Sequence, residues 1–524
     1  MYMAINQHRQ HRQVAKGKDN STIVLECPSV KVVSRPTENV STRPDGRNSI
    51  KSCLRYTAED RRVANNLPKA CRARQAGISR RKKRMTITPD IQTGIGAAPS
   101  EPRGLVLRIA VKQCDAVAVT LWILVTFVQF RGDELLLYPL ALYFAVRAWQ
   151  RRTEMAWLMA RSLPIMLLPL WSMISPLWAV EPMIAFKTSV YLMLTMVICY
   201  VIVLSLEPRQ ILYSVLAATG TVAVLNVLYG LGTGQMVPGL FPHKNMLGTN
   251  MVILWTAAVA ITLDRGAPRK FRSIGAVLAT LSLFLIFKSQ SATAIVLAAA
   301  TAGGVLLASP VLLGKWLRPL RLAAICIALA AVTGLAAWVL ANPLGDVVGS
   351  TLDALGKDRS MTGRTVLWTY AEDQIREEPL LGVGSGGFWR YDESPLIRKI
   401  HEDFYKGSRT TFNFHNSFYE IAVHQGLIGL GMTFVAMVWA LGWTLRGAMT
   451  LGTIPAIFFL CQAAAVTIRI FAEADFYKPF VLFHMLLWIG ALTVMRQIRG
   501  LQRERMRAAE NHGVSQVRFL PEPD

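Results

Sequence analysis

The sequence predicts an all-α polytopic membrane protein with about twelve transmembrane helices. Apolar residues make up 52% of its 524 residues and charged residues only 17%, a balance typical of chains that lipid solvates over much of their length. Several apolar runs approach the roughly 20 residues that cross a bilayer. The net charge of +24 comes from basic residues in the N-terminal region, the C-terminal tail and short loops, which is the pattern that membrane orientation produces. We therefore expect no nucleic-acid partner.

Residues 1–84 are polar, aperiodic and basic, with 20 Lys and Arg against 6 Asp and Glu. A segment of this composition cannot bury enough apolar surface to fold alone, so we expect residues 1–115 to form a basic, disordered cytoplasmic region. Its basic run, 80–84, could bind anionic lipid; the alternatives are a solvated tail or a translation start at Met85. No signal peptide is expected, because the first apolar run starts near Ala116 and lacks a cleavage pattern at its end.

Twelve apolar runs can be interpreted as membrane spans. They lie near residues 116–131, 134–150, 156–175, 183–205, 211–231, 246–263, 273–288, 292–309, 321–341, 416–443, 452–470 and 478–495. With the basic N-terminus in the cytoplasm, every second loop is cytoplasmic too, and each of those loops carries Arg or Lys, whereas most opposite loops are poorer in cations. This arrangement places spans 1–9 in residues 116–341, spans 10–12 in 416–495, and a basic cytoplasmic tail in 496–524. The long loop 342–415 then lies on the outer face.

The loop 342–415 is expected to contain short helices. Thr362-Gly-Arg364 resembles a helix cap and first turn, and apolar residues recur at nearly helical spacing as far as Ile375, before Pro379. Four glycines then supply turns: Gly382, Gly384, Gly386 and Gly387. They are not a nucleotide fingerprint, because no strand precedes them and no helix with an acidic partner follows.

Polar and cationic residues at two places on the outer side suit phosphate. His243, Lys244 and Asn245 lie at the mouth of a predicted helix N-terminus, where backbone N–H groups favour anions; the alternative is an interfacial anchor that snorkels. Arg364 in the long loop can hold phosphate oxygens bidentately. Its alternative role is a surface ion pair with Glu372 or Asp373.

His415 and Asn416 lie where the long loop enters the tenth span, among aromatic residues that are common at a membrane interface. An imidazole there has the pKa range needed to take a proton from a hydroxyl. Glu420 lies about one and a half helical turns further on, so it need not share a face with His415. As an orienting partner for His415 it is one option only.

Ionisable residues also lie at the ends of other spans. Arg469 is close to Glu473 and Asp475 at the outer end of the eleventh span, and charged residues at membrane depth are by default a functional hypothesis. The simple alternative is an Arg469–Glu473 pair four residues apart. Lys288, at the outer end of the seventh span, is ambiguous in the same way. Arg161, inside the third span, could point into a cavity.

These motifs resemble those of the O-antigen ligase and polysaccharide polymerase superfamily (WaaL/Wzy-like), especially its exopolysaccharide polymerases of the ExoQ type. The resemblance covers most of residues 116–495. It rests on the motifs at 241–248, at 362–364 with Trp368, at 379–384 with 387–388, and at 415–419 followed by 420–429. His424 stands where an acidic residue is common in the family, which leaves open how the acceptor is held.

The resemblance implies a glycosyltransferase of the bacterial inner membrane with a periplasmic loop 342–415. Its donor would be a polyprenyl-diphosphate-linked glycan and its acceptor another glycan, with no cofactor and no metal. Arg364 and Lys244 would bind the diphosphate, and His415 would act on the acceptor hydroxyl as general base or positioning group. Membrane lipids, a flippase and chain-length regulator proteins are the partners it implies. The seven cysteines form no CxxC pair, so the residues themselves predict neither a zinc site nor a disulfide framework.

Two other functions compete with a polymerase. An O-antigen ligase would transfer finished glycan to lipid A core or another acceptor, and motifs separate the two poorly. A transporter of small anions or lipid-linked sugars could use the same cations, but it would favour internal repeats and broken helices at mid-membrane depth. Here the candidate residues gather on one face. They are His243, Lys244, Asn245, Lys288, Arg364, His415, Asn416 and Arg469. The sequence therefore favours the enzyme.

Overall fold

The computed structural model describes residues 103–128, 130, 132–313, 361–408, 412–476 and 478–517, together with three short N-terminal strands. The chain divides into two units, residues 1–99 and 100–524. In the first unit the strands β1 (Ala4–Ile5), β2 (Leu25–Cys27) and β3 (Val30–Val33) form an antiparallel sheet in the order β1-β3-β2. These strands and the helix that begins at Arg103 lie within the region 1–115 that the sequence predicts to be disordered and cytoplasmic. For the rest of that region, disorder stays a prediction.

The described residues of the second unit are helical wherever they have regular structure, as predicted. The helices, in chain order, are α3 (Arg103–Phe127), α4 (Glu134–Gln150), α5 (Arg152–Ala160), α6 (Leu163–Ile174), the 3₁₀ turn η2 (Ser175–Leu177), α7 (Pro182–Ser205), α8 (Pro208–Thr233), α9 (Lys244–Leu263), α10 (Arg269–Ser289), α11 (Ala292–Leu313), α14 (Met361–Glu377), α15 (Pro395–Asp403), α16 (Ser417–Leu451), α17 (Ile454–Arg469) and α18 (Leu482–Val517). Each predicted span coincides with one of these helices or with a bent pair, except the ninth, 321–341, which lies outside the described residues.

Five helices, α7, α8, α9, α10 and α16, are long and apolar enough to cross a membrane, and a bent pair, α5 and α6, makes up to six. Shorter apolar helices occur at 113–127 and in α17. The chain is therefore a multi-pass membrane protein, while twelve crossings stay a prediction. Helix α18 continues to Val517, so the predicted tail 496–524 begins as an extension of the last helix.

The third predicted span, 156–175, is not one straight helix. Helices α5 and α6 meet at an angle of 99°. Pro164 stands at the start of α6, and because proline has no N–H and its ring clashes with the carbonyl four residues before it, the first helix cannot continue through this point. The break leaves α5 as a short helix that turns away from the direction of α6.

Small residues allow the helices to pack closely, as is common in membrane proteins. Gly248 on α9 lies against Ser289 at the end of α10 and Ala294 on α11, and Gly447 on α16 lies against Val494 on α18. A methyl group at either glycine would come within 3 Å of those side chains. Helix α9 consequently has extensive contact with α10 and α11, and α16 with α6, α17 and α18. The antiparallel pairing of α9 with α10 sets the start of α9 beside the end of α10.

Helix α16 is broken near its start, at Gly426, which has a φ of 64°. The segment from Pro379 to Val383 fills the break: Leu427 N–H donates to Pro379 O at 2.8 Å, and Val383 N–H donates to Val423 O at 3.0 Å. Backbone groups released by a break in a membrane helix must find partners inside the protein. The glycine-rich turn of the long loop supplies them, and so fixes the loop onto α16.

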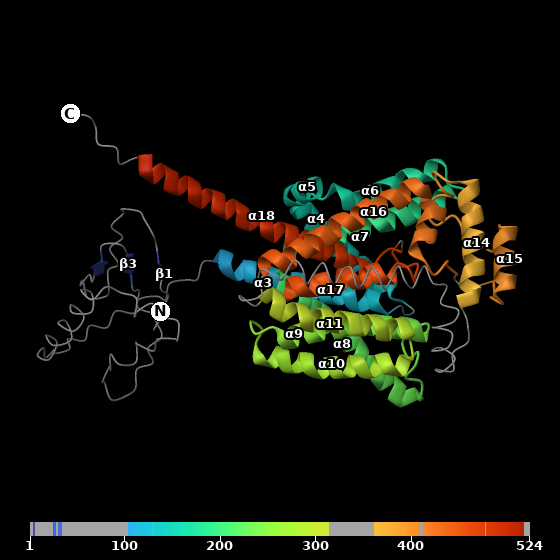
Figure 1. Ribbon diagram of the computed structural model, residues 1–524, viewed down its shortest axis with the longest axis horizontal. Coiled ribbons are helices and arrows are strands. Elements are labelled where there is room, and N and C mark those ends of the chain that lie inside the picture. Colours follow the sequence, from blue (N-terminus) through green and yellow to red (C-terminus); the bar gives the residue numbers. More distant parts are fainter. Residues whose placement is uncertain are drawn as a thin grey trace, which may run out of the picture. The chain divides into compact units, whose positions relative to one another are not determined.

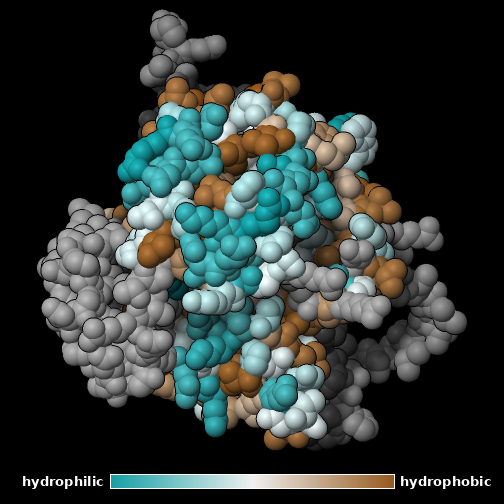
Figure 2. Space-filling view, turned by 90° about the vertical axis from the view of Figure 1, so that its right-hand side faces the viewer, coloured by the Kyte–Doolittle hydropathy of each residue, from teal (hydrophilic) through white to brown (hydrophobic). Residues whose placement is uncertain are grey.

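The loops that the charge pattern placed on the outer face meet at one end of the bundle. Helices α14 and α15 stand there (Figure 1), and Arg390 in the long loop forms a 2.6 Å ion pair with Glu181 before α7. Ser417 at the start of α16 donates to the carbonyl of Glu473, between α17 and α18, at 2.6 Å. Figure 2 views this end, and hydrophilic side chains gather over its middle. The candidate residues for chemistry lie at this end.

Candidate functional site

His415 and Asn416 connect the long loop to α16. Asn416 caps the helix, because its Oδ1 accepts hydrogen bonds from the N–H groups of Phe418 (2.9 Å) and Tyr419 (3.5 Å). His415 has a φ of 50°, a conformation that costs a non-glycine residue about 1–3 kcal/mol and that clusters at functional sites. Its N–H donates to Asn413 Oδ1 at 2.9 Å, which helps to hold it there. Asn416 therefore positions His415, and its predicted contact with substrate stays a prediction.

Glu420 supports the peptide next to His415 rather than its ring. Its Oε2 accepts from Phe414 N–H at 3.1 Å, and its Oε1 accepts from the indole N–H of Trp389 at 2.9 Å. The same Oε1 lies 3.4 Å from Nε2 of His424, which is also buried. Direct orientation of the His415 imidazole by Glu420, one option from the sequence, is therefore not what the structure shows.

The imidazole of His415 instead faces Glu473, in the loop between α17 and α18. Nδ1 of His415 lies 3.7 Å from Oε2 of Glu473, which is within ion-pair range but longer than a hydrogen bond. Burial alone would raise the pKa of Glu473, but the contact with His415 and the charge of Arg469 outweigh burial and lower the pKa below its ordinary value of 4.5. An ionised Glu473 favours a proton on Nδ1 of His415, which leaves Nε2 as the basic nitrogen.

Arg469 is paired with Asp475, so the alternative of an Arg469–Glu473 ion pair is wrong. Its Nε donates to Asp475 Oδ2 at 2.7 Å, its Nη2 contacts the same oxygen, and its guanidinium lies 4.7 Å from the ring centre of Phe483. Burial alone would raise the pKa of Asp475, but the charges of Arg469 and Lys478 outweigh it and the pKa is lowered. Both carboxylates are therefore ionised near neutral pH.

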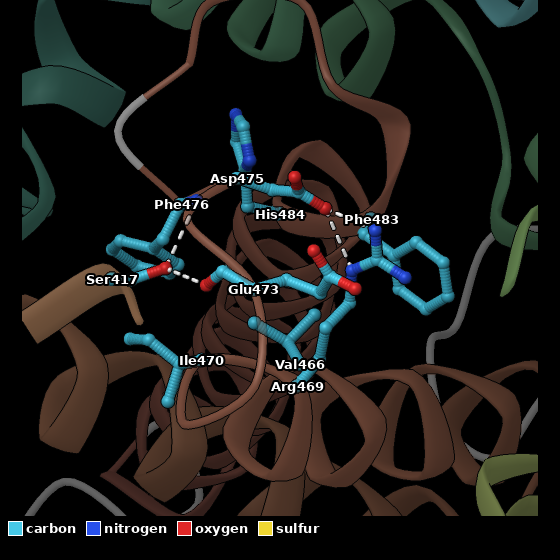
Figure 3. A pocket seen from close by; sticks show the side chains of 9 residues that line it. All are labelled: Ser417, Val466, Arg469, Ile470, Glu473, Asp475, Phe476, Phe483 and His484. Atoms are coloured by element: carbon cyan, nitrogen blue, oxygen red, sulfur yellow. Dashed lines mark hydrogen bonds and ion pairs between the residues drawn. The ribbon is translucent and has the colours of Figure 1, made fainter. Parts of the chain in front are cut away.

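The side chains of this loop enclose only a small cavity. Figure 3 shows Glu473 and Asp475 pointing toward the guanidinium of Arg469, with Ser417 bound to the loop backbone. The cavity measures about 10 Å³, which is room for about one water molecule. A diphosphate does not fit there. We therefore interpret Arg469 as the group that holds Asp475 in place and whose charge helps to keep Glu473 ionised. Its predicted direct contact with substrate stays a prediction.

The start of α9 lies beside the His415–Glu473 pair. His243 caps α9, since its Nδ1 accepts from Met246 N–H at 3.2 Å. Partial loss of solvent lowers the pKa of His243; the charges of Glu473 and Asp475 oppose this, and those of His415 and Lys478 add to it. His243 is consequently neutral near pH 7. Helix α9 also packs against α17, which ends just before Glu473.

Lys244 and Asn245 lie in the first turn of α9, and both are exposed to solvent. Their side chains are free to meet a ligand at the helix N-terminus, where unpaired backbone N–H groups add positive potential. Both residues therefore lie where the sequence predicted an anion site, next to His243. Binding of a ligand by either residue stays a prediction.

Arg364 lies in the first turn of α14, one helical turn before Trp368. The indole N–H of Trp368 donates to the carbonyl of Phe414 at 2.9 Å, and its ring stacks on Tyr419 with centres 5.5 Å apart. Residues four apart share one face of a helix. Arg364 is thus on the face of α14 that packs against the residue preceding His415.

The alternative role of Arg364, an ion pair with Glu372 or Asp373, is wrong. Both carboxylates pair with Arg376, at 3.8 and 2.6 Å. In the described part of the chain Arg364 itself forms no ion pair. Its guanidinium is therefore available to an anionic ligand. The neighbouring cations Lys357 and Arg359 lie outside the described residues.

Two other candidates are not part of this group. Lys288, on the last turn of α10, is exposed with its Nζ 6.0 Å from the ring centre of Phe284. It shares the outer end of the bundle with the site but contacts none of the other candidates among the described residues. Arg161 lies at the bend between α5 and α6, exposed and stacked over Trp157 at 4.1 Å, so the prediction that it points into a cavity is wrong.

Glu473 is a candidate site residue that the sequence presents only as a possible partner of Arg469. The signal for it in the sequence is the segment 472–475, which puts two carboxylates on an otherwise apolar outer loop. Among the described residues, no group of three or more His, Cys, Asp and Glu has an arrangement that could hold a metal ion.

The fold and the site define a multi-pass membrane protein in which a histidine–carboxylate pair, two candidate phosphate-binding cations and a buried Arg–Asp pair meet at one end of a helical bundle. Comparison with known proteins identifies the family. A family model described as O-antigen ligase (Wzy_C) matches residues 276–434. The exopolysaccharide production protein ExoQ of Rhizobium meliloti (strain 1021) is 30% identical over 334 residues, which cover 62% of this chain and 75% of that protein. The chain belongs to the O-antigen ligase and polysaccharide polymerase superfamily and is ExoQ-like.

This membership confirms the resemblance and supports an activity of the ligase or polymerase type in exopolysaccharide or O-antigen assembly, with lipid-linked glycans as substrates. The matched family region includes Arg364 and His415 but ends before Glu473. The site therefore combines residues from inside and outside that region.

Proposed function

We propose that the protein is a glycosyltransferase of the bacterial inner membrane that polymerises polyprenyl-diphosphate-linked oligosaccharide repeat units on the periplasmic side. The observation that carries this proposal is the pairing of His415 with Glu473, 3.7 Å apart, beside the cationic start of α9. Glycan transfer from a diphosphate requires a base for the acceptor hydroxyl and, close to it, a site that binds the diphosphate leaving group. The name of the relative, an exopolysaccharide production protein, favours a polymerase over a ligase.

The base in this proposal is His415. Nε2 takes the proton of an acceptor hydroxyl while the hydroxyl oxygen forms a bond to the anomeric carbon of the donor sugar. Glu473, through Nδ1, stabilises the imidazolium that results. Attack opposite the leaving group inverts the anomeric centre. His415 would then release its proton to water or to the departing phosphate.

The leaving group is a polyprenyl diphosphate, whose bond to the anomeric carbon breaks as the new bond forms. Its developing negative charge needs fixed cations in a site that excludes much of the water. Arg364 and Lys244, with the N–H groups at the start of α9, fill this role in our proposal, and His243 and Asn245 line the same helix start. The ionised carboxylates of Glu473 and Asp475 would keep the diphosphate from the Arg469 side.

The proposal is tested by glycan transfer in liposomes that contain the purified full-length protein and a lipid-diphosphate-linked repeat unit, without nucleotide sugar and with or without a chelator. His415→Ala and Arg364→Ala are compared with Arg376→Ala, an exposed arginine on the same helix as Arg364. Chains that lengthen with wild type and Arg376→Ala, but not with the other two variants, are the expected result. Unchanged activity in the chelator tests the prediction that no metal is needed.

Either of two results would contradict the proposal and assign another function. Transfer of one finished glycan to a separate lipid acceptor, without lengthening, makes the protein a ligase. If no glycosidic bond forms while labelled substrate crosses the bilayer, the protein is a transporter. The break in α16 does not favour that second outcome, because the backbone of the loop at Pro379 and Val383 already fills it.

A further inference from the structure

Four arginines converge at the end of the bundle opposite His415. Arg161 ends α5, Arg446 lies near the end of α16, and Arg499 and Arg503 lie four residues apart on α18. Past the break at Gly426, α16 rises roughly 30 Å to Arg446 at 1.5 Å per residue, about the thickness of the hydrocarbon core of a bilayer. The cluster is therefore at the other membrane boundary from the candidate site.

Two tryptophans organise these arginines. The guanidinium carbons of Arg161 and Arg503 lie 4.1 and 4.4 Å from the ring centre of Trp157. Those of Arg446 and Arg499 lie 5.2 and 5.7 Å from the ring centre of Trp443. These contacts are cation–π interactions, which fix the position of a guanidinium without neutralising its charge. The electrostatic repulsion between the guanidinium groups is thus left in place.

No carboxylate in the described residues forms an ion pair with any of the four. Arg499 lies beyond the predicted end of the last span, and its pKa is lowered, first by loss of solvent and then by the charges of Arg161, Arg503 and Arg446. Like charges that converge in this way repel one another, and a bound anion would relieve that repulsion. Arginines that only set membrane orientation have no reason to converge from three helices.

An apolar groove begins next to the cluster. It is lined by Pro164 on α6 and by Phe434, Val435, Val438 and Trp439 on α16, and its volume is about 360 Å³. Trp439 lies 6.2 Å from Trp443 between ring centres, so the groove continues along α16 from the tryptophan that Arg446 and Arg499 cover. A hydrocarbon chain suits a groove with only apolar walls, whereas a free soluble anion has no use for it.

We propose that Arg161, Arg446, Arg499 and Arg503 bind the phosphate headgroup of an anionic membrane lipid, one acyl chain of which lies in the groove between α6 and α16. The shared chemistry is a phosphate held by guanidinium groups. The groove identifies a lipid, rather than inorganic phosphate or pyrophosphate, as its source. Arg161 at the bend between α5 and α6 links the headgroup to the corner where the helix direction changes.

The test is native mass spectrometry of the full-length protein with phosphatidylglycerol, cardiolipin or phosphatidylcholine, and separately with pyrophosphate. Arg499→Gln and Arg503→Gln are each expected to weaken anionic-lipid binding about fivefold, and the double variant about 30-fold, since a cation near an anionic surface contributes about that factor. Arg505→Gln removes the same charge from the neighbouring exposed part of α18 and should bind as wild type does. Phosphatidylcholine and pyrophosphate should not saturate the site.

A second variant tests the groove without touching an arginine. Val438→Trp fills it and should reduce anionic-lipid binding, whereas Val224→Trp, at another exposed position on α8, should not. Equal binding by Arg499→Gln/Arg503→Gln and Arg505→Gln would overturn the proposal, as would equal binding of the neutral lipid. Saturation by pyrophosphate together with indifference to Val438→Trp would make this a site for a soluble anion and not for a lipid.

Discussion

Nδ1 of His415 lies 3.7 Å from Oε2 of Glu473. The pair joins the segment that enters α16 to the loop between α17 and α18, and both ends are anchored: His415 by Asn413 at 2.9 Å and the backbone of Glu473 by Ser417 at 2.6 Å. A carboxylate on one ring nitrogen selects the tautomer in which the other nitrogen is a base. Glu473 is thus as informative for mechanism as His415 itself.

Glu473→Gln should lower the rate of glycan transfer by about two orders of magnitude, within the range that general-base catalysis contributes. The amide keeps the size of the side chain but cannot stabilise a charged imidazolium. We expect kcat to fall more than KM rises, because the interaction strengthens only as the proton moves to His415. Transfer in liposomes, measured against substrate concentration, checks this.

The matched control for that variant is Glu378→Gln, at an exposed position just after α14. Glu473→Asp should recover part of the lost activity, because it restores the charge at a greater distance. If Glu473→Gln were as active as Glu378→Gln, the assignment of Glu473 to the reaction would be wrong. Loss of protein from the membrane fraction in the variant would instead point to a role in folding.

Arg364→Lys should raise KM for the lipid-linked donor and lower kcat, because lysine keeps the charge but not the bidentate geometry for phosphate oxygens. Arg376→Lys on the same helix should be nearly neutral, since Arg376 is 72% exposed and exposed ion pairs contribute little. Donor-concentration series for the two variants provide the comparison. If the two variants had equal KM values for the donor, the assignment of Arg364 to the donor site would be wrong.

Much of the fold follows from the sequence because hydropathy and charge bias report directly on lipid and orientation. Those signals placed the loops before α7 and α9, the long loop and the loop before α18 on one face, and Arg390–Glu181 and Ser417–Glu473 contacts bring them together. The bend at Pro164 cannot be predicted in this way, because the apolar run continues through it and hydropathy carries no information on helix direction.

The site was predicted less completely, because local spacing cannot reveal which loops touch. Glu420 is near His415 along the chain, yet its carboxylate binds Phe414 and Trp389. Glu473 is remote in sequence and faces the imidazole. The sequence is therefore enough to identify His415 as a candidate, because it lies where the long loop enters α16. Its partner Glu473 can be identified only from the packing of α16 against α17 and α18.

Asp475→Asn should lower the free energy of unfolding at pH 7 by about 3 kcal/mol, and with it the melting temperature. The reason is that the substitution leaves the charge of Arg469 buried without its partner. The effect depends on pH. The pKa of Asp475 is lower in the folded protein than its ordinary value of 3.8, so the stabilisation is complete above that value and is lost as the pH falls through the lower, folded-state pKa.

The difference in melting temperature between wild type and Asp475→Asn should therefore be large at pH 7 and should narrow steadily below about pH 4. Asp373→Asn, at the exposed ion pair with Arg376, is the control and should change the melting temperature little at any pH. A gap that stays constant down to pH 3 would contradict a lowered pKa for Asp475.

Gly426→Ala tests whether the break in α16 is required. Gly426 has a φ of 64°, and a methyl group there would lie 2.0 Å from the carbonyl oxygen of Leu380. Its φ of 64° and ψ of −175° fall in a region that is essentially restricted to glycine, and this conformation alone costs an alanine about 1–3 kcal/mol. The overlap with a backbone atom must add to that cost, since the loop at Leu380 would have to move. We expect a strongly destabilised protein that has also lost activity, because the same loop leads to the residues packed around Phe414.

Gly431→Ala is a sharp control, since it lies on the same helix with nothing within 4 Å of the added methyl group. Alanine is the better helix former by about 0.5–1 kcal/mol, so this variant should be neutral or more stable. Melting temperature and transfer rate of the two variants separate the explanations. If Gly426→Ala melted like Gly431→Ala and stayed active, α16 would be able to run straight, and the contact of Pro379 and Val383 with its break would not be what holds the long loop over the site.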